Sequence, residues 1–161
     1  CRLIPGVSTF IDIGSGYGKV VFHAKMSADV SRAVGVEYVE ARAKIASKIQ
    51  NELLVCGPQD IGILDSIAQR KLHDCSLFEG DATTWKSFDF SHIYMYDRVF
   101  SKKTLSLLAK KLNKSSYIVL ISYRRFEEWQ QLGLKNARVI RSITMRTTGG
   151  QNFKAYIYVK E

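Results

Sequence analysis

The sequence predicts an α/β protein in which helices cover the faces of a β-sheet. Strand-like and helix-like apolar segments alternate in a regular order along the chain. A cluster of glycines follows the first strand-like segment and leads into a helix-like one. The chain has 161 residues, of which 46% are hydrophobic, and this is enough to bury a core without a disulfide or a metal ion.

The elements follow from apolar patterning and turn residues. In chain order, we expect a strand at 8–13, a helix at 20–26, a strand at 32–37, a helix at 39–56, strands at 75–79 and 92–96, a helix at 102–112, a strand at 117–122, and strands at 137–145 and 153–159. The last two are separated by Thr147-Thr-Gly-Gly-Gln, which predicts an antiparallel hairpin.

The long helix carries an apolar stripe with four-residue spacing. The stripe consists of Ala41, Ile45, Ile49 and Leu53. Gly57-Pro58 should end this helix. The segment 61–72 fits either a continuation of the helix or a loop.

The net charge of +9 is unevenly distributed. Residues 1–97 carry 10 basic and 12 acidic side chains, a net charge of −2, whereas residues 98–161 carry 14 and 3, a net charge of +11. A basic field on one part of a protein indicates a polyanionic partner such as nucleic acid or the nucleosome. The alternative is the soluble surface of a basic protein.

Several classes are disfavoured by composition. The three cysteines are odd in number and lack C-x-x-C spacing, which fits buried side chains in a reducing compartment. The three histidines have no metal-ligand spacing, so we expect no metal site, and the apolar runs are too short for a membrane span. We expect one domain over 1–161. Because the sequence starts with Cys1 just before the first strand, it can be a fragment that lacks an N-terminal segment.

The glycine cluster has the form Asp12-x-Gly14-x-Gly16-x-Gly18. A dinucleotide fingerprint, G-x-G-x-x-G, would need glycine where Lys19 stands. The spacing resembles motif I of the class I S-adenosylmethionine-dependent methyltransferases. That cofactor carries a sulfonium, an ammonium and only one carboxylate, so it favours an acidic site over a phosphate-binding one. The negative net charge of residues 1–97 agrees with this choice.

This resemblance implies a Rossmann-like, seven-stranded sheet of order 3-2-1-4-5-7-6 with a C-terminal antiparallel hairpin. It also implies that Asp12 faces the methionine part of S-adenosylmethionine, that Glu37 accepts hydrogen bonds from the ribose hydroxyls, and that Asp81 meets the adenine amino group. The expected cofactor-binding residues are Asp12, Gly14, Ser15, Gly16, Tyr17, Gly18, Glu37, Tyr38, Asp81, Ala82 and Tyr96.

The methyl acceptor is expected at the end of the fourth strand, where Asp97 and Phe100 have the character of an orienting group and an aromatic wall. An amine must be neutral to attack, whereas the Asp97 carboxylate would favour an ammonium, so the net effect of Asp97 stays open. A helix cap or an ion pair with Arg98 is the structural alternative for Asp97.

Four stretches resemble the non-SET histone-lysine methyltransferases of the "disruptor of telomeric silencing" type. They are 10–21, Gly35-Val-Glu37, Asp97-Arg-Val-Phe100 and a late hairpin over 143–158. This resemblance implies methylation of a lysine of a histone or of another nucleic-acid-associated protein, inside the cell and in the nucleus rather than the cytoplasm, with the basic C-terminal part on the nucleosome. It also implies that Asp97 stands in place of the family's asparagine and that Phe100 and Tyr123 line a lysine channel. Ala82 departs from the family, which has an aromatic residue there.

Two other functions stay open. Residues 96–100 can be a degenerate (Asp/Asn)-Pro-Pro-(Tyr/Phe) motif, with which RNA and DNA amino-methyltransferases hold a base, although both prolines are missing. Tyr117, Tyr123, Phe126 and Trp129 would then suit base stacking, but core packing is the favoured interpretation for them. The third possibility is a catalytically silent fold that binds the cofactor or a partner subunit.

Overall fold

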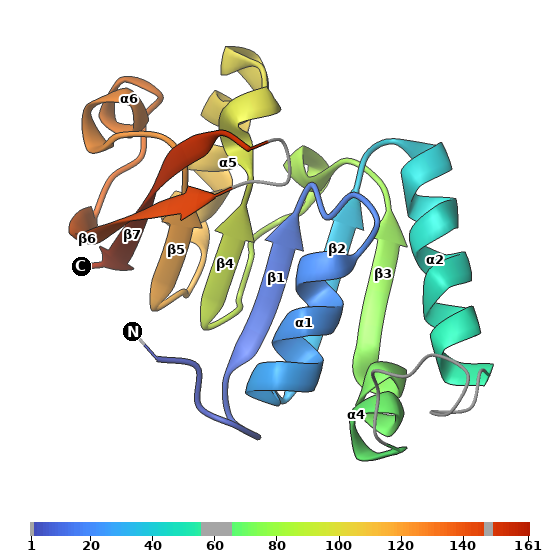
Figure 1. Cartoon of the computed structure of the whole chain (residues 1–161). Coiled ribbons are helices and arrows are strands. Elements are labelled where there is room, and N and C mark those ends of the chain that lie inside the picture. The colour runs from blue at the N-terminus through green and yellow to red at the C-terminus, as the bar shows by residue number, and fades with distance from the viewer. Residues whose placement is uncertain (1, 56–65, 147–149) are drawn as a thin grey trace. The chain divides into compact units, whose positions relative to one another are not determined.

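The computed structural model describes residues 2–55, 66–146 and 150–161 (Figure 1). The described residues contain seven strands in one mixed sheet of order β3-β2-β1-β4-β5-β7-β6, as predicted. Contacts divide the chain into two compact units, Arg2–Ala82 and Thr83–Glu161, which are described in turn.

The first unit holds three parallel strands and the helices that follow them. Its elements are β1 (Thr9–Ile13), α1 (Lys19–Ala28), β2 (Arg32–Glu37), α2 (Glu40–Val55), α4 (Ser66–Lys71) and β3 (Cys75–Glu79). Ile13 pairs with Val36, and Glu37 pairs with Glu79. The carboxyl ends of the three strands therefore meet at one edge of the sheet, where α/β proteins bind ligands.

Helix α2 packs differently from the predicted stripe. Its buried residues are Ala43 and Ala46, whereas Ala41 is exposed and Ile45 is 45% exposed. The apolar spacing at 41, 45, 49 and 53 therefore does not mark the buried face. Small side chains face the core because they allow the helix axis to approach β2 and β3, which α2 contacts.

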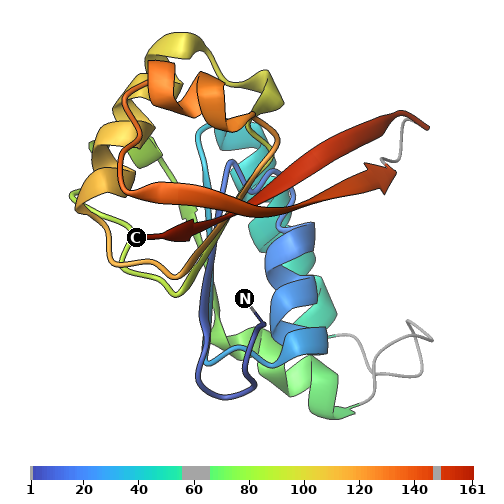
Figure 2. The ribbon, with the colours of Figure 1, turned by 90° about the vertical axis from the view of Figure 1, so that its left-hand side faces the viewer.

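The second unit contains β4 (His92–Met95), α5 (Lys102–Lys114), β5 (Val119–Ser122), α6 (Phe126–Gln131), β6 (Ala137–Arg146) and β7 (Asn152–Lys160). Strands β4 and β5 are parallel, and β7 is antiparallel to both β5 and β6. The predicted hairpin is confirmed as a long two-stranded ribbon (Figure 2). A 3-10 helix at Asp97–Val99 directly follows Tyr96 at the end of β4.

The sequence did not predict α6, and the ambiguous segment is helical over Ser66–Lys71. The predicted stop at 57–58, the residues 61–65, and residues 147–149 of the hairpin turn lie outside the described residues. Within the described part of the chain, no helix is long and apolar enough to cross a membrane, and no three His, Cys, Asp or Glu side chains gather as a metal site would require. Cys75 is a buried free cysteine.

Candidate functional site

The glycine loop after β1 uses backbone conformations that favour glycine. The φ angles of Gly14, Gly16 and Gly18 are 80°, 56° and 78°. A Cβ atom at Gly18 would lie 3.0 Å from the ring of Phe22, but a Cβ atom at Gly16 would meet no atom within 4 Å. The loop is therefore packed at its helix end and open at Gly16, where a ligand can approach the backbone.

Glu37 holds this loop from the end of β2. One carboxylate oxygen accepts a hydrogen bond of 2.7 Å from the Gly16 N–H, and the other accepts one of 2.9 Å from the Val39 N–H. The side chain is buried at 5% exposure. Each carboxylate oxygen has a second lone pair, so Glu37 can still accept a hydrogen bond from a ligand hydroxyl.

Asp12 lies at the same edge and is 2% exposed. Its Oδ1 atom has no hydrogen-bond partner among the residues that the structure describes. Burial, reinforced by the nearby charge of Glu37, raises the pKa of Asp12 to about 8. A buried carboxyl without a partner is costly. A cationic ligand would relieve this cost, because it favours the ionised form.

Gly35 permits the close approach of the loop to β2. A Cβ atom at Gly35 would lie 2.8 Å from Ser15 Oγ, 2.9 Å from Ser15 Cβ and 3.0 Å from Leu77 Cδ2. Ser15 also donates its backbone N–H to the Val36 carbonyl at 3.1 Å. The strand of the acidic residue and the glycine loop therefore fit together only because position 35 has no side chain.

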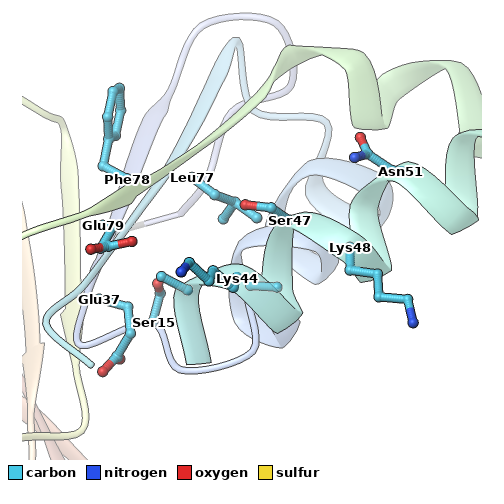
Figure 3. A pocket seen from close by; sticks show the side chains of 11 residues that line it. Ser15, Glu37, Lys44, Ser47, Lys48, Asn51, Leu77, Phe78 and Glu79 are labelled. Carbon is cyan, nitrogen blue, oxygen red and sulfur yellow. The ribbon is translucent and has the colours of Figure 1, made fainter. Parts of the chain in front are cut away.

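A cavity of about 340 Å³ opens between α2 and the ends of β2 and β3 (Figure 3). Its lining includes Ser15 and Glu37 from the predicted cofactor set, Lys44 and Asn51 from α2, and Leu77 from β3. In Figure 3, Ser15 and Glu37 lie at one end of this cavity and Asn51 at the other. The size is that of a small-molecule site.

The remaining predicted cofactor residues of this unit surround the same edge. Tyr17 and Tyr38 are 52% and 76% exposed. Asp81 is half-buried, and Ala82 is buried at the start of a 3-10 helix. The Gly80 N–H donates to the Glu37 carbonyl at 2.9 Å, which ties the segment before Asp81 to β2. The structure thus gathers these residues around the ends of β1, β2 and β3.

Asp97 lies in the second unit and is fully buried. Its Oδ2 atom accepts a hydrogen bond from the Ser122 hydroxyl, and its Oδ1 atom accepts one of 2.8 Å from the Tyr123 N–H. Burial raises the pKa of Asp97 above its ordinary value, while these hydrogen bonds and Arg124 oppose the rise. The carboxyl therefore joins the end of β4 to the end of β5, which is a positioning role.

Four aromatic side chains and one arginine lie together around the end of β4, and we call this group the acceptor cluster. It consists of Tyr94, Tyr96, Arg98, Tyr123 and Phe153. The ring of Tyr96 lies 4.9 Å from that of Tyr123 and 6.1 Å from that of Phe153, centroid to centroid. The hydroxyls of Tyr94 and Tyr123 are 3.1 Å apart, and the Arg98 guanidinium lies 4.6 Å above the Phe153 ring. Tyr123 is buried, whereas Tyr94, Tyr96 and Phe153 are half-buried and Arg98 is exposed, so the half-buried rings and Arg98 are the parts of the cluster that a planar base can contact.

The cluster combines residues that the sequence assigned to two different sites. Tyr96, predicted to bind the cofactor, and Tyr123, predicted to line the acceptor site, are in direct ring contact. Phe100 is half-buried just after the 3-10 helix that begins at Asp97. Tyr117, Tyr123 and Trp129 are buried, as the core interpretation predicts, whereas Phe126 is half-buried.

The sequence reasoning missed Arg98, Phe153 and Ser122 as site residues. Arg98 is adjacent to a predicted residue, and Ser122 ends a predicted strand. Phe153 needed the strand order, because β7 brings it to the cluster by pairing with β5. In antiparallel pairs, the register decides which side chains meet, and β6, exposed along nearly its whole length, lacks the one-sided apolar pattern that would specify the register of the ribbon.

Comparison with known proteins identifies the class of fold. The family model of the histone methylation protein DOT1 matches residues 2–56, less than half of the chain. No curated protein matches the sequence significantly. Among solved structures, 98% of the chain aligns with the B. subtilis tRNA (m1A22) methyltransferase TrmK (14% identity, TM-score 0.64) and with an RNA methyltransferase from Salinibacter ruber in complex with S-adenosyl-L-homocysteine (14%, 0.61).

A Streptococcus pneumoniae protein proposed to be a tRNA (m1A22) methyltransferase is similar at 12% identity, with a TM-score of 0.65 and 98% of the chain aligned. The chain spans 62% of TrmK, 65% of the pneumococcal protein and 84% of the Salinibacter protein. These likenesses and the strand order show the Rossmann-like fold of the class I S-adenosylmethionine-dependent methyltransferases.

Proposed function

We propose that the protein is an S-adenosylmethionine-dependent methyltransferase that methylates a nitrogen of an RNA base. The proposal rests on two sets of residues, an acidic set at the glycine loop and the acceptor cluster at the end of β4. The observation that carries the choice of RNA is the position of Arg98 in that cluster.

The residues at the glycine loop fit the proposed cofactor. Asp12 would face its cationic methionine part, since Oδ1 is buried and has no partner in the described structure. Glu37 would accept from the ribose hydroxyls, and the open side of Gly16 leaves room for close approach. Bound there, S-adenosylmethionine would supply an electrophilic methyl group.

The acceptor cluster favours a nucleic acid over a lysine. Arg98 lies against Phe153, and Arg124 donates to the Arg98 carbonyl at 3.2 Å, so two guanidinium groups stand at the end of β4. They would repel a lysine ammonium, whereas they would attract phosphate. A neutral base nitrogen also needs no prior deprotonation, unlike a lysine amine with its ordinary pKa near 10.4.

Asp97 contributes by positioning. Both of its carboxylate oxygens are hydrogen-bonded within the protein, to Ser122 and to the Tyr123 N–H. It therefore fixes Tyr123, whose buried ring supports that of Tyr96, and the half-buried ring of Tyr96 would then contact the base. Methyl transfer depends mainly on such placement of the attacking lone pair.

Histone-lysine methylation is the second candidate, because the family model of the histone methylation protein DOT1 matches residues 2–56. That match ends within the first unit, before β3, and includes no residue of the acceptor cluster. It therefore supports the glycine loop and β2 more directly than it supports any acceptor. The solved structures named above as RNA methyltransferases align over 98% of the chain, which includes the acceptor cluster.

The test is a transfer assay with radiolabelled methyl donor offered separately to total tRNA, nucleosomes and free histones. We expect label in tRNA, removed by ribonuclease and resistant to protease, and nucleoside analysis should place it on a base nitrogen. Arg98→Ala should reduce the transfer, whereas Lys103→Ala, an exposed change on α5, should not.

Label in histones alone would instead establish the lysine function. If calorimetry detects no binding of S-adenosylmethionine and no substrate is labelled, the fold is catalytically silent.

A further inference from the structure

A second hollow, of about 550 Å³, lies within the second unit between the start of α6 and the β6–β7 ribbon. Its lining is two arginines, two aromatic residues, one valine and one carboxylate: Arg125, Arg138, Phe126, Tyr156, Val139 and Glu127. None of these residues belongs to the acceptor cluster or to the glycine loop. The hollow is therefore distinct from both of those groups of residues.

The hollow and the acceptor cluster use opposite faces of β7. Successive side chains of a strand point to opposite sides, so Phe153 and Tyr156, three positions apart, project to different faces. Phe153 contacts Tyr96, whereas Tyr156 lines the hollow. Strand β5 pairs with β7 only from Tyr156 onward, so the part of the ribbon nearer its turn is paired on one side only.

The ribbon around the hollow is basic and exposed. Between Trp129 and Lys160 the sequence has no acidic residue. All residues of β6 except Ala137 are exposed, including Arg138, Arg141 and Arg146. Arg138 forms an ion pair with Glu161 at 3.6 Å. Both side chains are more than half exposed, so this pair is weak and a phosphate can replace it.

We infer that this hollow binds a nucleotide of the RNA substrate that flanks the methylated base. The inference rests on the proposed function. The base would stack on Tyr156 and Phe126, and Arg125 and Arg138 would hold its phosphate. The RNA backbone would then pass around the part of β7 that is paired on one side only, and the hollow would anchor the strand on one side of the reacting base.

The chemistry of the lining favours RNA over a protein partner. Aromatic faces beside arginines are the combination that binds single-stranded nucleic acid, by stacking and by phosphate neutralisation. A histone tail is itself rich in lysine and arginine, and Arg125 and Arg138 would repel it. Glu127 can accept a hydrogen bond from an exocyclic amine of the stacked base.

The test compares RNA binding by variants of the 161-residue chain, using the anisotropy of a fluorescein-labelled, 20-nucleotide single-stranded RNA of mixed sequence. Arg125→Ala with Arg138→Ala should weaken binding roughly tenfold and lower the salt slope by about 0.7, the contribution of the one phosphate that the two arginines would hold. Lys103→Ala with Lys110→Ala, two exposed residues of α5, removes the same charge and should change neither quantity.

Tyr156→Leu should weaken binding roughly tenfold, because it removes the stacking ring but keeps an apolar side chain. Tyr156→Phe keeps the ring and should bind as the unmodified protein does. Thermal unfolding of each variant, followed by the fluorescence of the buried Trp129, verifies that the second unit is intact.

The outcomes separate the inference from the function on which it rests. If the unmodified protein binds and methylates RNA while the arginine and Tyr156→Leu variants bind equally well, the hollow is not a nucleotide site and the proposed function stands. If the unmodified protein binds S-adenosylmethionine and histones but does not bind RNA, the proposed function and this inference both fail.

Discussion

Asp12 couples the binding of a cationic ligand to pH. In the ligand-free protein the pKa of Asp12 is about 8, so the carboxyl is mostly neutral at pH 7. A ligand with an ammonium and a sulfonium favours the ionised form. We therefore expect the affinity for S-adenosylmethionine, measured by calorimetry, to rise as the pH increases from about 6 to about 7.5, below the range in which an α-amino group itself titrates, with release of a proton on binding.

Asp12→Asn is the matched variant. It should bind S-adenosylmethionine about tenfold more weakly or worse, because an amide cannot ionise, and its affinity should no longer depend on pH in this range. In the ligand-free protein, the raised pKa means that stability falls as the pH rises from about 4 to about 8. Asp12→Asn should remove this decline in thermal unfolding. An unchanged pH dependence in the variant would assign the effect to another group.

A side chain at Gly35 should destabilise the protein. Gly35→Ala places a methyl group 2.8–3.0 Å from Ser15 and Leu77. We expect a loss of about 1–3 kcal/mol in the free energy of unfolding, together with weaker cofactor binding, because the glycine loop must move. Denaturant titration and calorimetry measure the two effects.

Ser15→Gly removes the nearest atoms and should restore part of the stability of Gly35→Ala. If it restores none, the strain is at Leu77 instead of the loop.

At the scale of elements, α2 offers a test of which face is buried. Ala46→Leu inserts a larger side chain at 1% exposure, so we expect a loss of about 1–3 kcal/mol in stability. Ile45→Ala truncates a side chain that is 45% exposed and should cost less than about 1 kcal/mol. Denaturant unfolding of both variants ranks the two positions. The reverse ranking would restore the stripe that the sequence suggested.

The contrast between α2 and the strands shows what patterning can predict. Strands β2 and β3 have the predicted bounds, because each apolar run is bounded by turn residues and has the length of a strand, too short for a typical helix. Helix α2 misleads because alanines are weak hydrophobic signals, yet they form the buried contact. Helix α6 was missed because its six residues contain one buried side chain, Trp129, too few for a periodic pattern.

The cofactor residues were easier to predict than the acceptor residues for a related reason. Asp12, Gly16 and Glu37 lie at the carboxyl ends of neighbouring parallel strands, so the chain order alone places them together. The acceptor cluster needs the ring of Phe153, which comes from an antiparallel strand whose register the sequence pattern does not specify.

At the scale of the whole molecule, the uneven charge predicts two different responses to salt. The basic excess lies entirely in residues 98–161, while residues 1–97 have a net charge of −2. RNA affinity should therefore fall about tenfold or more between 50 and 200 mM KCl, through release of counterions. The affinity for S-adenosylmethionine should change little over this range, since its contacts are buried and local.

Anisotropy and calorimetry on the same protein sample measure the two affinities. A steep salt dependence of both would mean that the cofactor, too, is held mainly by exposed charge, and would contradict the buried role of Asp12.

The buried network around Ser122 also gives the protein an optical reporter. The indole N–H of Trp129, a fully buried residue, donates at 2.8 Å to the Ser122 hydroxyl, which in turn donates to Asp97. The Ser122 hydroxyl is therefore the only group between Asp97 and the indole in this chain of hydrogen bonds. A change in the charge of Asp97, or in its hydrogen bond with the Tyr123 N–H, should alter the environment of the indole. With the other tryptophan replaced, in Trp85→Phe, the emission wavelength of Trp129 would follow events beside the acceptor cluster in real time, without any label.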